Sequence, residues 1–351
     1  MLIMLSKLIA LTDEFPGLLA RLENLLQEQA DNGFILQGKF SKREISLAGH
    51  HFYLIYSDAR HLRKDIHILQ EHGIIDSSKP RYYEYASPKI KSRYIELIDE
   101  NTYQALPPAR QVLAHNACFF NQTEHVEKTE LFNYKGLPEQ FNIGVNFAPF
   151  GRNHLVAWNT PWASGGRHLA LRQVYQGINH FYWADSLSEQ IGNAEYHLLF
   201  NAGGTGNSSD IFHFQILQER FPAFENLAEY YPYRGSEIIP TSERAWPFTG
   251  FLARYTAKSK KYLLDDFNKQ AKQWLAQNSA NTFNLLIQQQ DNLREMFFIK
   301  RRQDLGHIHG ISNYFGGYEV AGNIVVENQN EYKYFPDRIR HIEWIADSCP
   351  N

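Results

Sequence analysis

A histidine and a glutamine stand two residues apart in the segment Ile211-Phe-His213-Phe-Gln215, where they alternate with bulky apolar residues. This alternation predicts a strand over 211–217, and residues two apart on a strand point to the same face. His213 and Gln215 should therefore face one side together. A neutral imidazole can attack a phosphorus atom at neutral pH and hold the transferred group covalently. A glutamine amide can donate to a phosphoryl oxygen without adding negative charge.

A loop rich in glycine and serine, residues 202–210, comes directly before this strand. Glycines permit unusual backbone angles and the close approach of an anion. Successive backbone N–H groups in such a loop can form a concave nest for phosphate. The candidate phosphate-binding residues are Gly203, Gly204, Thr205, Ser208 and Ser209. A structural interpretation stays open, because a lone strand histidine often serves only as a hydrogen-bonded core residue.

The composition limits what else the chain could bind. Its 351 residues carry a formal net charge of −3, so no global positive field gathers nucleic acid or an anionic membrane. The two cysteines, Cys118 and Cys349, exclude a disulfide framework and a cysteine-rich metal site. Five histidines between residues 50 and 72 lack a spacing typical of metal ligands. We expect no signal peptide, no membrane span and a cytoplasmic location.

The elements that must position these residues follow from periodicity and turn residues. Helical spacing of apolar residues predicts helices over 12–33, 60–72, 169–186 and 258–277. Alternating and apolar runs predict strands over 34–40, 44–56, 141–148, 154–158, 196–201 and 211–217. A hairpin of 282–289 and 295–302 should turn at Asp291-Asn292. Gly316-Gly317 should introduce a last strand, 318–327.

At the histidine strand the chain resembles the histidine-triad superfamily. It is most similar to the branch of GDP-hexose phosphorylases, diadenosine tetraphosphate phosphorylases and hexose-1-phosphate uridylyltransferases. That branch carries a His-x-His-x-Gln strand, matched here by Ile211-Phe-His213-Phe-Gln215. The resemblance implies that His213 is the nucleophile and that Gln215 contacts the transferred phosphate. It covers roughly residues 140–330 and follows the family's order of elements.

Two stretches before the histidine strand extend this resemblance. The segment from Asn146 through Pro149 to His154 resembles the family's strand–proline–turn–histidine–strand element. This implies that Asn146 lies near the nucleotide and that His154 supports the turn. Phe200 and Asn201 resemble the segment just before the catalytic strand. Asn201 is therefore a further candidate contact of the ribose or the base.

The C-terminal third resembles the second half-domain of the GDP-hexose phosphorylases. The hairpin ends in the basic run Lys300-Arg301-Arg302 and is followed by Tyr318-Glu-Val-Ala-Gly322. The resemblance implies that Lys300, Arg301 and Arg302 neutralise a β- or γ-phosphate, with Lys300 and Arg302 as the selected candidates, although a solvated strand end explains this run equally well. The literal His307-Ile-His309 lacks a glutamine two residues further on. We interpret it as part of a loop.

The chain departs from the family pattern at the first histidine, which is Ile211 here. In the family the catalytic ring is oriented largely by that residue's backbone carbonyl, which isoleucine retains, but the imidazole side chain is lost. In the uridylyltransferases the first histidine also helps to hold zinc beside a Cys-x-x-Cys pair. Here Cys118 stands alone. We expect no structural zinc, no other metal and no cofactor, which favours a phosphorylase over a uridylyltransferase.

The resemblance implies an α+β fold with two histidine-triad-like half-domains, about residues 140–220 and 280–330, on an antiparallel sheet with flanking helices. We divide the chain into an N-terminal helical and hairpin extension, 1–130, and a transferase domain, 131–351. The expected activity is that of a nucleotidyltransferase or phosphorylase. It would act on a nucleoside diphosphate-sugar or dinucleoside polyphosphate through a nucleotidyl-His213 intermediate.

The function and the oligomeric state stay open at this point. A hydrolase of the same substrates and a catalytically silent nucleotide-binding protein are the alternative functions, and the loss of the first histidine favours the silent one. The oligomeric state is also open, and a homodimer is one outcome. We expect a nucleotide-containing small molecule as the partner, with neither nucleic acid nor membrane.

Overall fold

The computed structural model describes most of the chain. The described residues are 17–32, 39–47, 49–57, 82–84, 94–98, 100–106, 126–146, 149–159, 162–164, 167–203, 205, 211–302, 316–326 and 328–335. The expected helix over 60–72, both cysteines and His307-Ile-His309 lie outside these residues.

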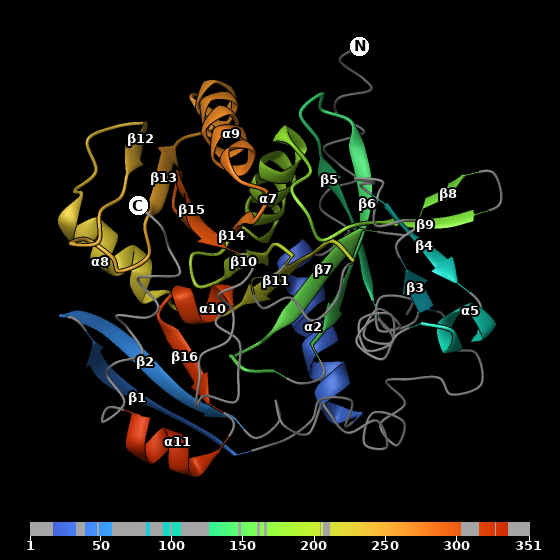
Figure 1. Ribbon diagram of the computed structural model, residues 1–351, viewed down its shortest axis with the longest axis horizontal. Coiled ribbons are helices and arrows are strands. Elements are labelled where there is room, and N and C mark those ends of the chain that lie inside the picture. The colour runs from blue at the N-terminus through green and yellow to red at the C-terminus, as the bar shows by residue number, and fades with distance from the viewer. Residues whose placement is uncertain are drawn as a thin grey trace.

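A nine-stranded sheet forms the centre of the fold, in the order β12-β13-β15-β14-β10-β11-β7-β6-β5 (Figure 1). Every neighbouring pair in it is antiparallel. Its strands are β5 Glu127–Phe132, β6 Pro138–Val145, β7 Leu155–Asn159, β10 His197–Asn201, β11 His213–Leu217, β12 Glu237–Pro240, β13 Gly250–Tyr255, β14 Asn281–Gln290 and β15 Leu293–Arg302. The expected α+β class with an antiparallel sheet is confirmed.

The large sheet consists of two similar halves. In the first half β6 and β7 are followed by helix α7, Ile178–Ile191, and then by β10 and β11. In the second half β12 and β13 are followed by helix α9, Lys260–Gln277, and then by β14 and β15. The halves join where β10 pairs with β14, with Leu198 opposite Ile287. β11 and β15 therefore occupy equivalent places in the two halves.

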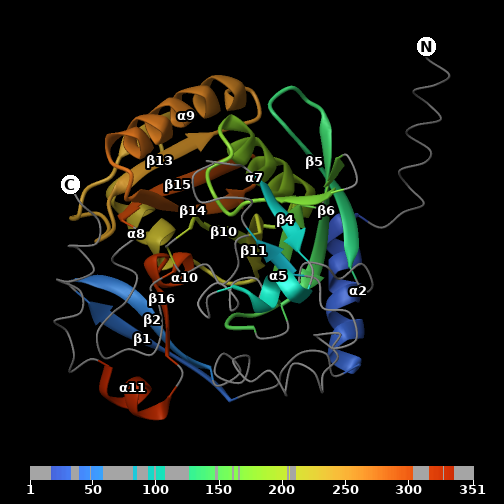
Figure 2. The same cartoon turned by 45° about the vertical axis from the view of Figure 1, so that its right-hand side comes forward.

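The two faces of the large sheet are covered differently. Helix α2, Leu18–Asp31, packs with α7 and α9 on one face, against side chains such as Phe212, Phe214 and Phe298. The opposite face packs against α8, Pro222–Tyr230, and α10, Gly317–Val320. In Figure 2, α7 and α9 lie above the strands of the large sheet and a small sheet, β1-β2-β16, lies below.

The smaller elements complete the fold. In the three-stranded sheet, β2 His50–Ser57 pairs with β1 Phe40–Leu47 and, in parallel, with β16 Asn323–Val326. A four-stranded sheet contains β3 Tyr82–Glu84, β4 Tyr94–Ile98, β9 Arg167–Leu171 and β8 Trp162–Ser164. The short helices are α5 Glu100–Gln104 and α11 Gln329–Tyr334. In the described part of the chain, every helix is too short or too polar to cross a bilayer.

Three expected elements are wrong, and each contains a glycine with positive φ. The single strand expected over 44–56 is the β1–β2 hairpin, which turns at Gly49 with φ 82°. The helix expected from residue 169 begins only after Gly177, φ 70°, and β9 precedes it. The strand expected over 318–327 is α10 and β16, separated at Gly322, φ 106°. Apolar patterning conceals such turns, because apolar residues continue in the sequence on both sides of each glycine.

The hairpin of β14 and β15 forms as expected and turns at Asp291, where φ is 50°. A buried polar chain crosses it on the α8 side of the sheet. The Arg254 Nε donates to Glu295 Oε1 at 2.6 Å, and both side chains are nearly inaccessible, at 2% and 6%. Gln288 donates to the other oxygen of Glu295 and accepts from the His197 ring. The strands β13, β15, β14 and β10 are thereby tied together through side chains.

Candidate active site

His213 begins β11 and pairs with Trp158 of β7. The residue is 4% exposed. Its Nδ1 lies 2.7 Å from the backbone oxygen of Ile211. Because a carbonyl oxygen can only accept, Nδ1 carries the proton and Nε2 carries the lone pair when the ring is neutral. The backbone carbonyl of Ile211 thus accepts a hydrogen bond from the His213 ring, as expected although its side chain is not an imidazole.

The His213 ring is neutral at physiological pH. Burial lowers the pKa of His213 to about 4, and the hydrogen bond to the Ile211 carbonyl offsets part of this effect. A neutral ring with its proton fixed on Nδ1 presents Nε2 as the nucleophilic atom. The geometry thus has the protonation state that attack on phosphorus requires.

Gln215 lies on the same face of β11 as His213. It pairs with Val156 of β7 on one side and Leu199 of β10 on the other. Its Oε1 is buried, and within the described part of the chain it has no hydrogen-bond partner. A buried polar atom without a partner is costly and suggests a group that a ligand completes.

Gln173 is a site residue that no motif or spacing in the sequence indicates. The residue is 1% exposed. Its Oε1 accepts from the backbone N of His213 at 2.6 Å. Its Nε2 donates to the backbone oxygens of Asn201, at 2.8 Å, and His213, at 3.1 Å. One side chain therefore fixes the backbone of the candidate nucleophile.

Asn201 belongs to a buried polar cluster at the junction of the two halves. Its Oδ1 accepts from Asn284 Nδ2 at 2.8 Å and from the backbone N of Gly317 at 2.6 Å. Asn284 Nδ2 also lies 3.0 Å from Thr205 Oγ1, and Arg301 Nη1 donates to Asn284 Oδ1 at 2.6 Å. A side chain added at Gly317 would come within 2.5 Å of Asn201 Oδ1, so this approach requires glycine.

Two of the expected phosphate-binding residues are engaged within the protein. The Gly203 N–H donates to the backbone oxygen of Gln173 at 2.9 Å. The Thr205 hydroxyl donates to the backbone oxygen of Ala202 at 2.7 Å, and the residue is fully buried. Neither group is a free donor in this arrangement. Gly204, Ser208 and Ser209 lie outside the described residues.

The structure does not bring Lys300 and Arg302 to His213. Lys300 pairs with Phe283 on the face covered by α7 and α9, and its Nζ lies 5.3 Å from the centre of the Trp274 ring. Arg302 pairs with Asn281, which bonds to α9 and so marks the same face. Since neighbours on a strand alternate, the cation between them, Arg301, points to the face that carries His213.

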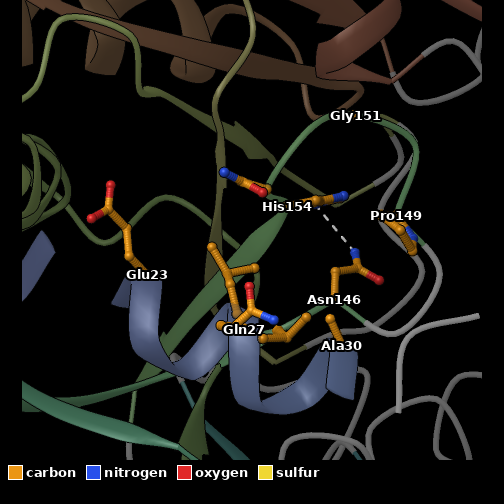
Figure 3. Close-up of a pocket in the computed structure, with 10 residues that line it drawn as sticks. Glu23, Gln27, Ala30, Asn146, Pro149, Gly151 and His154 are labelled. Atoms are coloured by element: carbon orange, nitrogen blue, oxygen red, sulfur yellow. Dashed lines mark hydrogen bonds between the residues drawn. The ribbon is translucent and has the colours of Figure 1, made fainter. Parts of the chain in front are cut away.

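Asn146 lies at a cavity of about 350 Å³ between α2 and the β6–β7 turn. Its Nδ2 lies 3.2 Å from the Nε2 of His154, so a side-chain hydrogen bond joins the two ends of the β6–β7 turn. Figure 3 shows Glu23 and Gln27 of α2 facing this pair across the cavity. In the sheet, His213 pairs with Trp158, and Trp158 pairs with Asn142 of β6. Asn146 comes four residues after Asn142, so it lies roughly 13 Å further along the strand direction than His213.

Solved structures of the yeast Ap4A phosphorylase Apa2 share this architecture. The complex with AMP has a TM-score of 0.60 at 12% sequence identity, over 94% of each chain. The complex with Ap4A has a TM-score of 0.58 at 11% identity, over 94% of this chain and 96% of that one. A further Apa2 structure has a TM-score of 0.56 at 12% identity, over 94% and 93%.

The chain has the fold of an Ap4A phosphorylase. Apa2 is a member of the histidine-triad superfamily, so the expected resemblance is confirmed at the level of the fold. No family model matches the sequence. No curated protein matches it either.

The Ap4A-phosphorylase fold of this chain contains no cluster of three or more potential metal ligands among the residues that the structure describes. His180 of α7 lies behind β11, where its ring contacts Phe212 and Phe214 at centroid distances of 5.2 and 5.6 Å. Neither of its ring nitrogens has a hydrogen-bond partner among the described residues.

Replacing His180 by phenylalanine should make the protein more resistant to acid. Burial lowers the pKa of His180 to about 3, so between pH 6.5 and 3 the unfolded chain binds a proton that the folded chain does not. The free energy of unfolding therefore falls as pH drops below about 6.5. At pH 5 the variant should recover about 2 kcal/mol of that loss. Thermal unfolding of both proteins at pH 7.5 and 5 measures it; an equal decrease for both contradicts it.

Proposed function

We propose that the chain is a nucleotidyltransferase or phosphorylase that acts through a nucleotidyl-His213 intermediate. The observation that carries the proposal is the neutral imidazole of His213, whose Nδ1–H is fixed by the Ile211 carbonyl. Gln215 on the same face and the fold shared with the yeast Ap4A phosphorylase support it. The proposed substrates are dinucleoside polyphosphates, such as Ap4A, and nucleoside diphosphate-sugars.

The proposed reaction has two displacements at one phosphorus. Nε2 of His213 attacks the α-phosphorus, a P–N bond forms, and the P–O bond to the phosphorylated leaving group breaks. The ring is then a nucleotidyl-imidazolium, whose positive charge the Ile211 carbonyl stabilises through Nδ1–H. An acceptor oxygen next attacks the phosphorus, the P–N bond breaks, and the ring returns to its neutral form.

The remaining contacts are assigned by chemistry. Gln215 would donate to a phosphoryl oxygen in both steps, and Gly204, Ser208 and Ser209 would bind the other oxygens. Asn146 would contact the ribose or base of a nucleoside in the 350 Å³ cavity. Asn201, Gly203 and Thr205 could contribute only by exchanging their present hydrogen bonds. Because His213 is 4% exposed, the substrate must also displace groups that enclose the ring.

A catalytically silent nucleotide-binding protein is the second candidate. The enclosure of His213 and the internal engagement of Gly203 and Thr205 favour it. A hydrolase would use the same first displacement, with water as the acceptor in the second. The three functions differ in whether an adduct forms and in what removes it.

Intact-protein mass spectrometry after incubation with Ap4A or nucleoside diphosphate-sugars tests the proposal. The native protein should gain the mass of one nucleotidyl group, and the His213→Ala variant should gain none. His50→Gln, a change at a half-buried histidine on β2, is the matched control and should form the adduct. Turnover that depends on added phosphate supports a phosphorylase, and turnover without phosphate supports a hydrolase. Nucleotide binding with neither adduct nor product supports the silent protein.

A further inference from the structure

The ladder between β10 and β11 stops where the candidate nucleophile begins. The paired residues run from His197 opposite Leu217 to Leu199 opposite Gln215. Continued in the same register, the ladder would pair Asn201 with His213. The Gln173 amide instead bonds to the Asn201 oxygen and to both the N and the O of His213, at 2.8, 2.6 and 3.1 Å.

The backbone of the two residues before Gln173 also supports the strand of His213. The oxygen of Leu171 accepts from the backbone N of Phe212 at 2.7 Å, and Arg172 forms a bridge with Ile211. Ile211 supplies the oxygen that holds the His213 ring. The segment 171–173 therefore fixes both the main chain of the nucleophile and the acceptor that orients its imidazole.

We propose that Gln173 is a positioning residue for His213, which it holds by replacing the missing ladder bonds with its side-chain amide. This inference rests on the proposed function, because positioning matters to a reaction only if His213 is the nucleophile. The amide suits this task since it accepts from one backbone N–H and donates to two carbonyl oxygens. A methionine has similar length but leaves these three buried groups without partners.

Gln173 also connects the nucleophile to the glycine loop. Its backbone oxygen accepts from Gly203 N at 2.9 Å, while its side chain holds Asn201 and His213. A movement of the loop start would therefore be transmitted to His213 through one residue.

The test compares Gln173→Met with Gln176→Met. Gln176, three residues after Gln173, is a matched control, since it is also a buried amide. Within the described part of the chain, its Nε2 donates to the Arg172 oxygen at 2.9 Å. In single-turnover experiments with Ap4A, Gln173→Met should form the nucleotidyl adduct about 10- to 100-fold more slowly. The Kd for Ap4A should stay within about twofold, and the control should react at nearly the native rate.

Nitrogen NMR of the His213 ring supplies a readout that a general loss of stability would not change. Gln173→Met should shift the population away from the Nδ1–H form in folded protein, and Gln176→Met should not. If Gln173→Met fails to fold, Gln173→Glu replaces it in the test. Glutamate keeps the acceptor but loses both donors, so this variant should form the adduct more slowly than the native protein. Equal adduct rates and equal ring spectra for the two methionine variants overturn the proposal. If the native protein forms no adduct, the proposed function fails, whereas the ring spectra still decide on Gln173.

Discussion

Replacing His213 by alanine should lower the rate of nucleotide transfer by roughly 10⁴-fold or more, with little change in the Kd for the substrate. The size of the effect follows from the proposed chemistry, because the imidazole forms the bond to phosphorus and no other described group on this face replaces it. Steady-state kinetics and calorimetric binding with Ap4A measure the two quantities. A loss below tenfold, with intact folding, would show that the ring is not the nucleophile.

The same ring should give the reaction an unusual tolerance of acid. With its pKa at about 4, His213 stays neutral and nucleophilic from pH 8 down to about 5.5. A histidine with the ordinary pKa of about 6.5 would be roughly 90% protonated at pH 5.5 and would react about tenfold more slowly. Rates of adduct formation in single turnovers, measured across this range, separate the two cases. The nitrogen chemical shift of Nε2, the atom that gains the proton, provides an independent titration.

Replacing Glu295 by leucine should lower the free energy of unfolding by about 3–5 kcal/mol. Glu295 forms a buried ion pair with Arg254 and accepts from Gln288. Its removal leaves the Arg254 guanidinium, 2% exposed, without its carboxylate in a region of low dielectric constant. Denaturant unfolding followed by circular dichroism measures the loss.

The double replacement, Arg254→Met with Glu295→Leu, distinguishes the ion pair from simple packing. It removes both charges and should recover most of the stability that Glu295→Leu loses, because apolar groups can replace a buried pair at little net cost. An additive decrease in the double variant would contradict this account. A surface pair such as Arg220 with Glu225, 3.7 Å apart, is the control and should contribute less than about 1 kcal/mol.

The sequence allowed the strand of the candidate nucleophile to be predicted, because its pattern is local. Alternation alone puts His213 and Gln215 on one face of β11 and Phe212 and Phe214 on the other, as the structure has them. The β14–β15 hairpin could also be predicted, since a turn sequence at Asp291 separates two regular apolar runs. In the structure Asp291 has a left-handed backbone. Alternation with period two predicts the faces of a strand correctly when the two faces of the sheet lie in different environments.

The supporting residues could not be predicted, because their roles depend on contacts between distant segments. Gln173 lies 40 residues before His213 and belongs to no recognisable motif. Lys300 and Arg301 are adjacent cations of equal charge, and only the register of β15 assigns one to each face. Asn284 is a polar residue within an apolar strand, and its function emerges only with Asn201 and Arg301 beside it.

The repeated architecture of the sheet has a consequence for stoichiometry. β11 and β15 occupy equivalent places in the two halves, yet the described residues of β15 include no histidine. Although its large sheet has two similar halves, each polypeptide should therefore have one reactive histidine. A rapid-quench burst should release one leaving group per polypeptide and then stop until an acceptor arrives, and a titration of covalent nucleotide should saturate at one equivalent.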